Sequence, residues 1–244
     1  YEISTRDWSS DVCSSDLSSG WGYGPHPIAA DGTILCMAYV SGTYPDGTTA
    51  VQDFTDYAIM TEKNGVFNVL LHGGQALPGF DAASYVFKTP SNVETIMNNN
   101  GFLATSAFVI HADGTAVAAG EPTGCELVRM PDGTLINLGK AGDPIPNGPA
   151  GAVWGTFSGG TTSNTWSDRN ILVFANSYSV GAQQSVGTVI CAWDPALGLR
   201  IIAQTGDTTY TGTPCNQITL GGSTMITGNG TSSNFNSNGQ LTCR

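Results

Sequence analysis

The histidines are the first residues of this sequence whose type could do chemistry. His26, His72 and His111 are separated by 46 and 39 residues, so no short spacing brings two imidazoles to one zinc ion. We interpret them as ordinary surface or loop residues. The sequence also has no Gly-x-Ser-x-Gly nucleophile motif and no glycine-rich phosphate loop. It therefore predicts no catalytic, cofactor-binding or metal-binding residue.

Asp143 and Asp207 each follow a glycine at corresponding places in the chain. They could be a repeated carboxylate that binds calcium or another ligand. Alternatively, each side chain accepts a backbone N–H group and fixes its own turn. No Asp-x-Asp-x-Asp-Gly loop accompanies them, so we favour the turn-fixing role.

Aromatic side chains could form stacking platforms for sugars. The candidates are Trp21, Tyr23, Trp154, Trp166 and Trp193. The alternative is that they pack inside a β structure, where large aromatic side chains contribute much of the buried area. We expect this packing role.

Five cysteines follow residue 17: Cys36, Cys125, Cys191, Cys215 and Cys243. The absence of a Cys-x-x-Cys pair argues against metal or thioredoxin chemistry. In a secreted protein some of them should pair. Cys191 and Cys215 are 24 residues apart, so a bridge between them is plausible and would stabilise the fold by about 3 kcal/mol.

Composition narrows the class of protein. The chain has 244 residues, of which 40% are hydrophobic and only 11% charged, with 32 glycines and 12 prolines. Its net charge of -11 argues against nucleic acid as a partner. No apolar run reaches about 18 residues, so no transmembrane segment is predicted. An acidic, turn-rich, mostly β protein remains.

Residues 1–17 differ in composition and residue pattern from the rest of the chain. In one reading frame, the widely used indexed sequencing adapter encodes Tyr1, Glu2 and Ile3 and then, after its variable index, DWSSDVCSSD. Because every fixed codon matches, we interpret residues 1–17 as translated adapter that lies outside the β architecture. The remaining chain has 7 basic and 15 acidic residues, a net charge of -8.

Short strand-like runs alternate with Asp-Gly and Asn-Gly turns, a pattern typical of all-β proteins. These runs are 33–40, 66–71, 103–110, 171–175, 186–193 and 199–203. No segment has a convincing helical period over ten residues. We therefore predict an all-β fold.

A spacing of 69 residues recurs through the chain. It separates Gly32, Gly101, Asn170 and Gly239, and an aliphatic residue follows two positions after each: Ile34, Leu103, Leu172 and Leu241. A fixed period of this size indicates a repeat architecture. We predict that these positions begin equivalent strands whose aliphatic residues face the core.

Each unit is predicted to contain four antiparallel strands, as a propeller blade does. Residues 18–244 then hold about three and a third units of about 69 residues, truncated at both ends. This number is too small to close a propeller of 4–8 blades, so we expect an incomplete propeller-like fragment. A sandwich would not explain the period, and the coils of a β-solenoid are usually shorter.

The four segments around these turns resemble degenerate copies of the Asn-x-x-Gly-x-x-Ala-Phe repeat of secreted bacterial tandem-repeat proteins. Asn98 and Asn236 supply the asparagine and Phe174 the phenylalanine, and the stretch 202–207, IAQTGD, is similar to a companion feature of that family. The resemblance implies a secreted or cell-surface location and no established catalytic site.

Two functions remain open. The first is a non-catalytic secreted or cell-surface repeat protein whose loops bind an extracellular ligand, carbohydrate or protein. The second is a fragment of a propeller enzyme that acts on polysaccharide. Such an enzyme would need carboxylates, or a tyrosine and histidine pair, converging at the propeller axis.

Overall fold

The described part of the chain is built from β-strands and turns alone. The computed structural model describes residues 31–39, 57–90, 95–157, 163–167, 169–181 and 183–207, and these contain no helix. The predicted all-β class is therefore confirmed. The predictions for residues 1–17, Gly239 and Leu241 lie outside the described residues.

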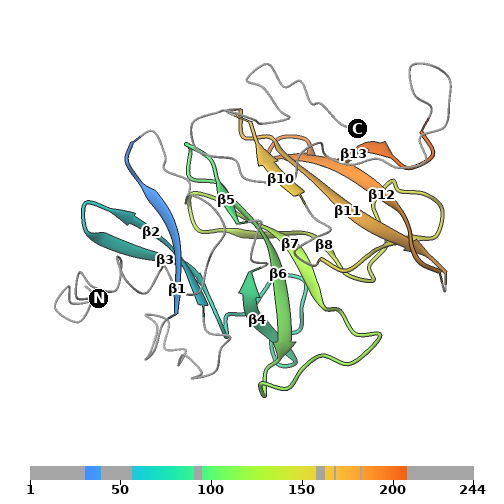
Figure 1. Ribbon diagram of the computed structural model, residues 1–244, viewed down its shortest axis with the longest axis horizontal. Coiled ribbons are helices and arrows are strands. Elements are labelled where there is room, and N and C mark those ends of the chain that lie inside the picture. Colours follow the sequence, from blue (N-terminus) through green and yellow to red (C-terminus); the bar gives the residue numbers. More distant parts are fainter. Residues whose placement is uncertain are drawn as a thin grey trace.

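Three antiparallel sheets follow one another in chain order (Figure 1). The first has the order β1 (Ile34–Tyr39), β2 (Tyr57–Lys63), β3 (Val66–His72). The second has the order β4 (Tyr85–Pro90), β6 (Leu103–His111), β7 (Gly124–Arg129), β8 (Leu135–Lys140), and β5 (Ile96–Met97) also pairs with β6. The third has the order β10 (Ser163–Trp166), β11 (Leu172–Val180), β12 (Gln183–Asp194), β13 (Gly198–Gln204), and β9 (Ala152–Trp154) also pairs with β11.

Equivalent strands begin where the 69-residue spacing predicts. The strands β1, β6 and β11 start at Ile34, Leu103 and Leu172. The turn residues before them, Gly32, Gly101 and Asn170, have φ angles of 85°, 80° and 61°. Asparagine is the residue that best replaces glycine in this left-handed conformation. Leu103 and Leu172 are fully buried, as predicted, and Ile34 is half-buried.

The turns before β6 and β11 share one hydrogen-bond pattern. Asn98 Oδ1 accepts the N–H groups of the residues two and four positions later, both at 3.0 Å. Ser167 Oγ accepts the corresponding two groups at 3.2 and 3.1 Å. The two turns also bind each other, because Asn170 Oδ1 accepts hydrogen bonds from the side-chain amides of Asn98, at 2.9 Å, and Asn100, at 2.8 Å.

In the first two units, the fourth strand pairs with the following sheet. The strands β4 and β5 lie beside β6, and β9 and β10 lie beside β11. The opposite edge of β4 binds the segment that follows β3. The Phe87 carbonyl accepts the N–H of Gly74, and the Phe87 N–H donates to the carbonyl of Gln75, both at 2.8 Å. Trp154 of β9 repeats both bonds with the segment that follows β8. The fourth strand therefore links two consecutive units.

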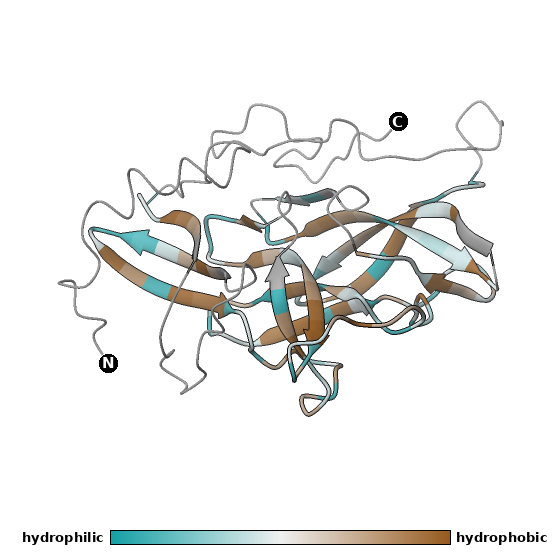
Figure 2. Ribbon diagram, turned by 60° about the horizontal axis from the view of Figure 1, so that its bottom comes forward, coloured by the Kyte–Doolittle hydropathy of each residue, from teal (hydrophilic) through white to brown (hydrophobic). Residues whose placement is uncertain are grey.

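The three sheets stack through two apolar clusters, and Figure 2 shows hydrophobic stretches along their strands. Leu103 belongs to the cluster shared with the first sheet, whereas its neighbour Ala104 belongs to the cluster shared with the third. Successive residues of a strand point to opposite faces, so the middle sheet is buried on both faces. This stacking is the arrangement expected of neighbouring blades in a propeller-like fragment.

Asn170 should carry two separable contributions to stability. Asn170→Gly keeps the backbone conformation and removes the acceptor of two hydrogen bonds, so we expect a loss of about 1 kcal/mol. Asn170→Ala adds the cost of a left-handed backbone, about 1–2 kcal/mol more. Urea unfolding measures both. The control is Asn64→Gly, in an exposed turn with φ 54°, which should change stability by less than about 0.5 kcal/mol. Equal stability of Asn170→Gly and wild type would contradict the coupling of the turns.

Candidate functional site

The strands end in two different kinds of connection. At one end of the second sheet, Leu103 pairs with Arg129 and Arg129 with Leu135, next to the tight turns at 98–101 and 130–134. At the other end, where β4 and β7 begin and β6 and β8 end, lie the longer segments 73–84, 112–123 and 141–151. We call these the turn end and the loop end.

The length of the connections at the loop end varies between equivalent units. The connection between the first and second strands has 12 residues in the second unit (112–123) and 2 in the third (181–182), whereas the corresponding residues of the first unit, 40–56, lie outside the described residues. The turns between the second and third strands are short, with 2, 5 and 3 residues (64–65, 130–134 and 195–197). In repeat proteins, insertions that vary from unit to unit collect on one face, which is often the binding face.

Charge also differs between the two ends. The described acidic side chains of the loop end are Asp81, Asp113, Glu121, Asp143 and Asp207, and those of the turn end are Asp31, Glu62, Asp132 and Asp194. Four described cations lie at the turn end: Lys63, Arg129, Arg169 and Arg200. Lys140 lies at the loop end, where its ammonium is 3.5 Å from a carboxylate oxygen of Asp143. The loop end is therefore the more acidic one.

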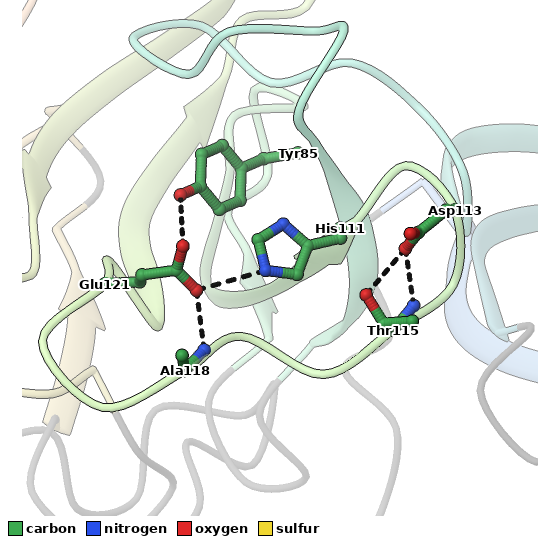
Figure 3. A network of polar contacts seen from close by, with 6 residues as sticks. All are labelled: Tyr85, His111, Asp113, Thr115, Ala118 and Glu121. Atoms are coloured by element: carbon green, nitrogen blue, oxygen red, sulfur yellow. Dashed lines mark hydrogen bonds and ion pairs between the residues drawn. The ribbon is translucent and has the colours of Figure 1, made fainter.

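Glu121 is the centre of a polar cluster at the loop end (Figure 3). Its Oε1 accepts a 3.2 Å hydrogen bond from the hydroxyl of Tyr85 in β4. Its Oε2 lies 3.0 Å from Nε2 of His111 at the end of β6 and accepts the backbone N–H of Ala118 at 2.6 Å. The Tyr85 and His111 rings stack with centroids 5.1 Å apart. This single carboxylate thus fastens the loop 112–123 to two strands.

Electrostatics favour the ionised form of this carboxylate. The Ala118 N–H group, and with it the His111 charge and the Tyr85 hydroxyl, lowers the pKa of Glu121. A carboxylate whose pKa is lower in the folded state stabilises the fold above its ordinary pKa and loses that contribution as pH falls through the lowered value. The contacts of Glu121 should therefore persist at neutral pH and weaken in strong acid.

The same cluster is the place where a tyrosine, a histidine and a carboxylate of the described chain converge. A tyrosine that acts as a nucleophile would need a lowered pKa. Burial, together with the charge of Glu121, instead raises the pKa of Tyr85. Its hydroxyl is also already a donor to that carboxylate. These features suit a clamp that holds a loop better than a catalytic pair.

A second carboxylate, Glu126 in β7, is completely buried between the second and third sheets. Its Oε2 accepts a 2.8 Å hydrogen bond from the Ser106 hydroxyl in β6, and its Oε1 accepts one of 2.8 Å from the Asn164 amide in β10. A buried charge is tolerated only with such partners. The arrangement fixes how the two sheets face each other, since Glu126 binds one residue from each of them.

Glu126 should tolerate an amide better than a truncation. Glu126→Ala removes the buried acceptor of the hydrogen bonds from Ser106 and Asn164, so we expect a loss of about 2–4 kcal/mol in chemical unfolding. Glu126→Gln can still accept from Asn164 and pair with the Ser106 hydroxyl, so its loss should stay near 1 kcal/mol. The interpretation is wrong if the glutamine variant is destabilised as much as the alanine variant.

The histidine predictions have mixed outcomes. His111 is a partly exposed residue at the start of a loop, as expected, but it pairs with Glu121. His72 was expected at the surface and is instead buried at the end of β3, where its Nδ1 lies 2.9 Å from the carbonyl oxygen of Gly73. His26 lies outside the described residues.

Asp143 and Asp207 have different partners. Asp207 Oδ2 accepts the backbone N–H of Gln204 at 2.8 Å, which confirms its turn-fixing role. Asp143 instead pairs with the Lys140 ammonium. Among the described residues, no group of three or more His, Cys, Asp and Glu side chains is placed to hold a metal ion.

The tryptophans that the structure describes are core residues. Trp154, Trp166 and Trp193 are only 2%, 9% and 4% exposed. The Trp166 ring lies tilted against Phe102 and edge-to-face against Trp193, and all three belong to the cluster between the second and third sheets. They cannot serve as sugar platforms in this state. Trp21 and Tyr23 lie outside the described residues.

The predicted bridge between Cys191 and Cys215 involves a residue, Cys215, that lies outside the described residues. Cys191 itself is a free thiol, fully buried in β12. It faces the cluster between the second and third sheets, and Cys125 of β7 faces the equivalent cluster one sheet earlier. Both thiols are therefore buried in apolar surroundings.

Burial should make these thiols unreactive. It raises the pKa of Cys191 to about 12 and that of Cys125 further, so neither forms thiolate near neutral pH. We expect no alkylation of Cys125 or Cys191 by iodoacetamide at pH 8 in the folded protein and full alkylation in denaturant, read by peptide mass spectrometry. Rapid labelling of either thiol in the folded protein would contradict the packing of β7 and β12.

The sequence did not single out Tyr85, Glu121 or Glu126. A signal existed for Glu126, which interrupts the apolar run from Cys125 to Val128 in the manner of a buried charge. No comparable signal marks Glu121, because its partners depend on how the loop folds back.

Comparisons with known proteins give no relative. No family model, no curated protein and no solved structure matches this chain. No described helix is long and apolar enough to cross a membrane.

Proposed function

We propose that this protein is a non-catalytic, secreted or cell-surface β-repeat protein whose loop end binds an extracellular ligand. The observation that carries the proposal is the contrast between the two ends. Turns of 2 to 5 residues recur at one end, whereas the equivalent described connections at the other end have 12 residues in the second unit and 2 in the third. Loops presented by a rigid scaffold are the usual place for binding residues.

The chemistry of the described side chains supports binding over catalysis. Glu121 and Glu126 hold a loop and a sheet interface, and the Tyr85 hydroxyl is engaged as a donor. The extracellular part of the proposal rests on the resemblance to secreted tandem-repeat proteins. The alternative, a fragment of a propeller enzyme acting on polysaccharide, is favoured only by the meeting of Tyr85, His111 and Glu121.

A matched pair of variants can test the loop end as the binding surface. Ala119 is exposed in the loop 112–123, and Thr134 is exposed in a tight turn at the opposite end. Ala119→Arg and Thr134→Arg add the same charge to the two ends. We expect binding to an array of neutral and acidic glycans to fall at least about fivefold in Ala119→Arg and to remain unchanged in Thr134→Arg.

Reducing-sugar release from the same polysaccharides, measured in parallel, separates the two candidate functions. Binding without release supports the proposal. Release that is lost in Tyr85→Phe would establish the enzyme instead. Retained binding in Ala119→Arg with loss in Thr134→Arg would place the binding surface at the turn end and overturn the proposal.

A further inference from the structure

We propose that the outer face of the third sheet is an interface for a fourth repeat unit, whose first strand is the segment 240–243 of this same chain. The third sheet is the last of the three described sheets (Figure 1). Its outer face, which points away from the second sheet, carries the apolar side chains Val173, Ala175, Ile190 and Ala192. No other described sheet contributes a side chain to their cluster.

This outer face corresponds to the faces through which the first two sheets bind the next one. The 69-residue spacing relates Val173 to Ala104 and Leu35. Leu35 lies in the cluster between the first and second sheets, and Ala104 lies in the cluster between the second and third. Val173 therefore occupies the position at which a following sheet packs in both earlier units.

The burial of this face indicates that its occupant belongs to the same chain. Val173, Ala175, Ile190 and Ala192 are at most 5% exposed, although the described residues include no sheet beyond them. A single chain thus already covers these side chains, and a second copy is not needed to do so.

The third strands of the units indicate how much of the outer face is covered. Each of these strands has one unpaired bulge residue at the same point of the register: Leu70, Leu138 and Ile202. Leu138 is only 7% exposed, because the complete third sheet packs against it, whereas Ile202 in the edge strand β13 is 44% exposed. A single strand that lies over β11 and β12 would produce this difference, since it would not reach β13.

The segment 236–243 has the sequence pattern of that strand. Its Leu241 continues the 69-residue spacing from Leu103 and Leu172. Leu103 and Leu172 lie in the clusters that their sheets share with the preceding sheet. Leu241 should therefore face the third sheet and pack against Val173, in the same way that the earlier leucines pack against the sheets before them.

Methyl NMR of the whole chain tests this interface. We expect nuclear Overhauser contacts between the methyl groups of Leu241 and those of Val173 or Ile190, with the Leu241 resonances assigned by their loss in Leu241→Ala. The positive control lies in the same spectrum, because Leu103 should show such contacts to Leu35 in the shared cluster. A spectrum with the control contacts but without contacts of Leu241 to the outer face would overturn the proposal.

A matched pair of variants tests the orientation of the strand. Leu241→Asp places a charge against the apolar outer face, whereas Thr242→Asp places it on the opposite side of the strand. We expect the Ile190 methyl resonance to shift in Leu241→Asp and to remain in place in Thr242→Asp. The Ile59 methyl occupies the equivalent position between the first and second sheets and should stay constant in both variants. Equal shifts of Ile190 in the two variants would contradict the proposed orientation.

Isotope filtering of a sample that mixes labelled and unlabelled chains distinguishes the same chain from a second copy. Contacts of Leu241 within one chain support the proposal. Contacts between labelled and unlabelled chains would show that a second copy occupies the outer face and would overturn it. The measurement needs no ligand, so its result does not depend on the proposed function.

Discussion

Every described sheet of this protein presents two apolar faces, and the need to cover both of them determines the rest of the architecture. Leu103 and Ala104 are neighbours in β6 and lie in different clusters, one shared with each adjacent sheet. A sheet of this kind cannot be stable alone. The sheets must therefore stack for the protein to fold. Two features join successive units and keep the stacked sheets in register. They are the shared fourth strand and the hydrogen-bonded turns.

The fourth strand explains why the repeat of the sequence and the sheet of the structure do not coincide. The 69-residue period marks the start of β1, β6 and β11 correctly, because a left-handed turn residue followed by a buried aliphatic is a local signal. Which sheet β4 and β9 join depends on backbone bonds to Phe87 and Trp154 from both sides. Pairing between strands of different units has no such local signature.

Side-chain roles that depend on nearby residues could be predicted, whereas roles that depend on distant strands could not. The role of Asp207 follows from its own turn and could be inferred from sequence. Glu126 binds Ser106, 20 residues earlier, and Asn164, 38 residues later, and Tyr85 lies 36 residues before Glu121. Such partners are brought together only by the stacking of sheets. The buried His72 was misjudged for the same reason, since its surroundings come from the packed end of β3.

The two buried or partly buried carboxylates show how one scaffold separates stability from function. Glu126 is fully enclosed, and changing its partners would disturb the interface between two sheets. Glu121 is a third exposed and holds a loop whose length is not dictated by the stacking, since the equivalent connection in the third unit has only two residues. A loop of that kind can change without loss of the core. The length of a loop at the loop end can therefore vary while the turn end keeps the sheets in register.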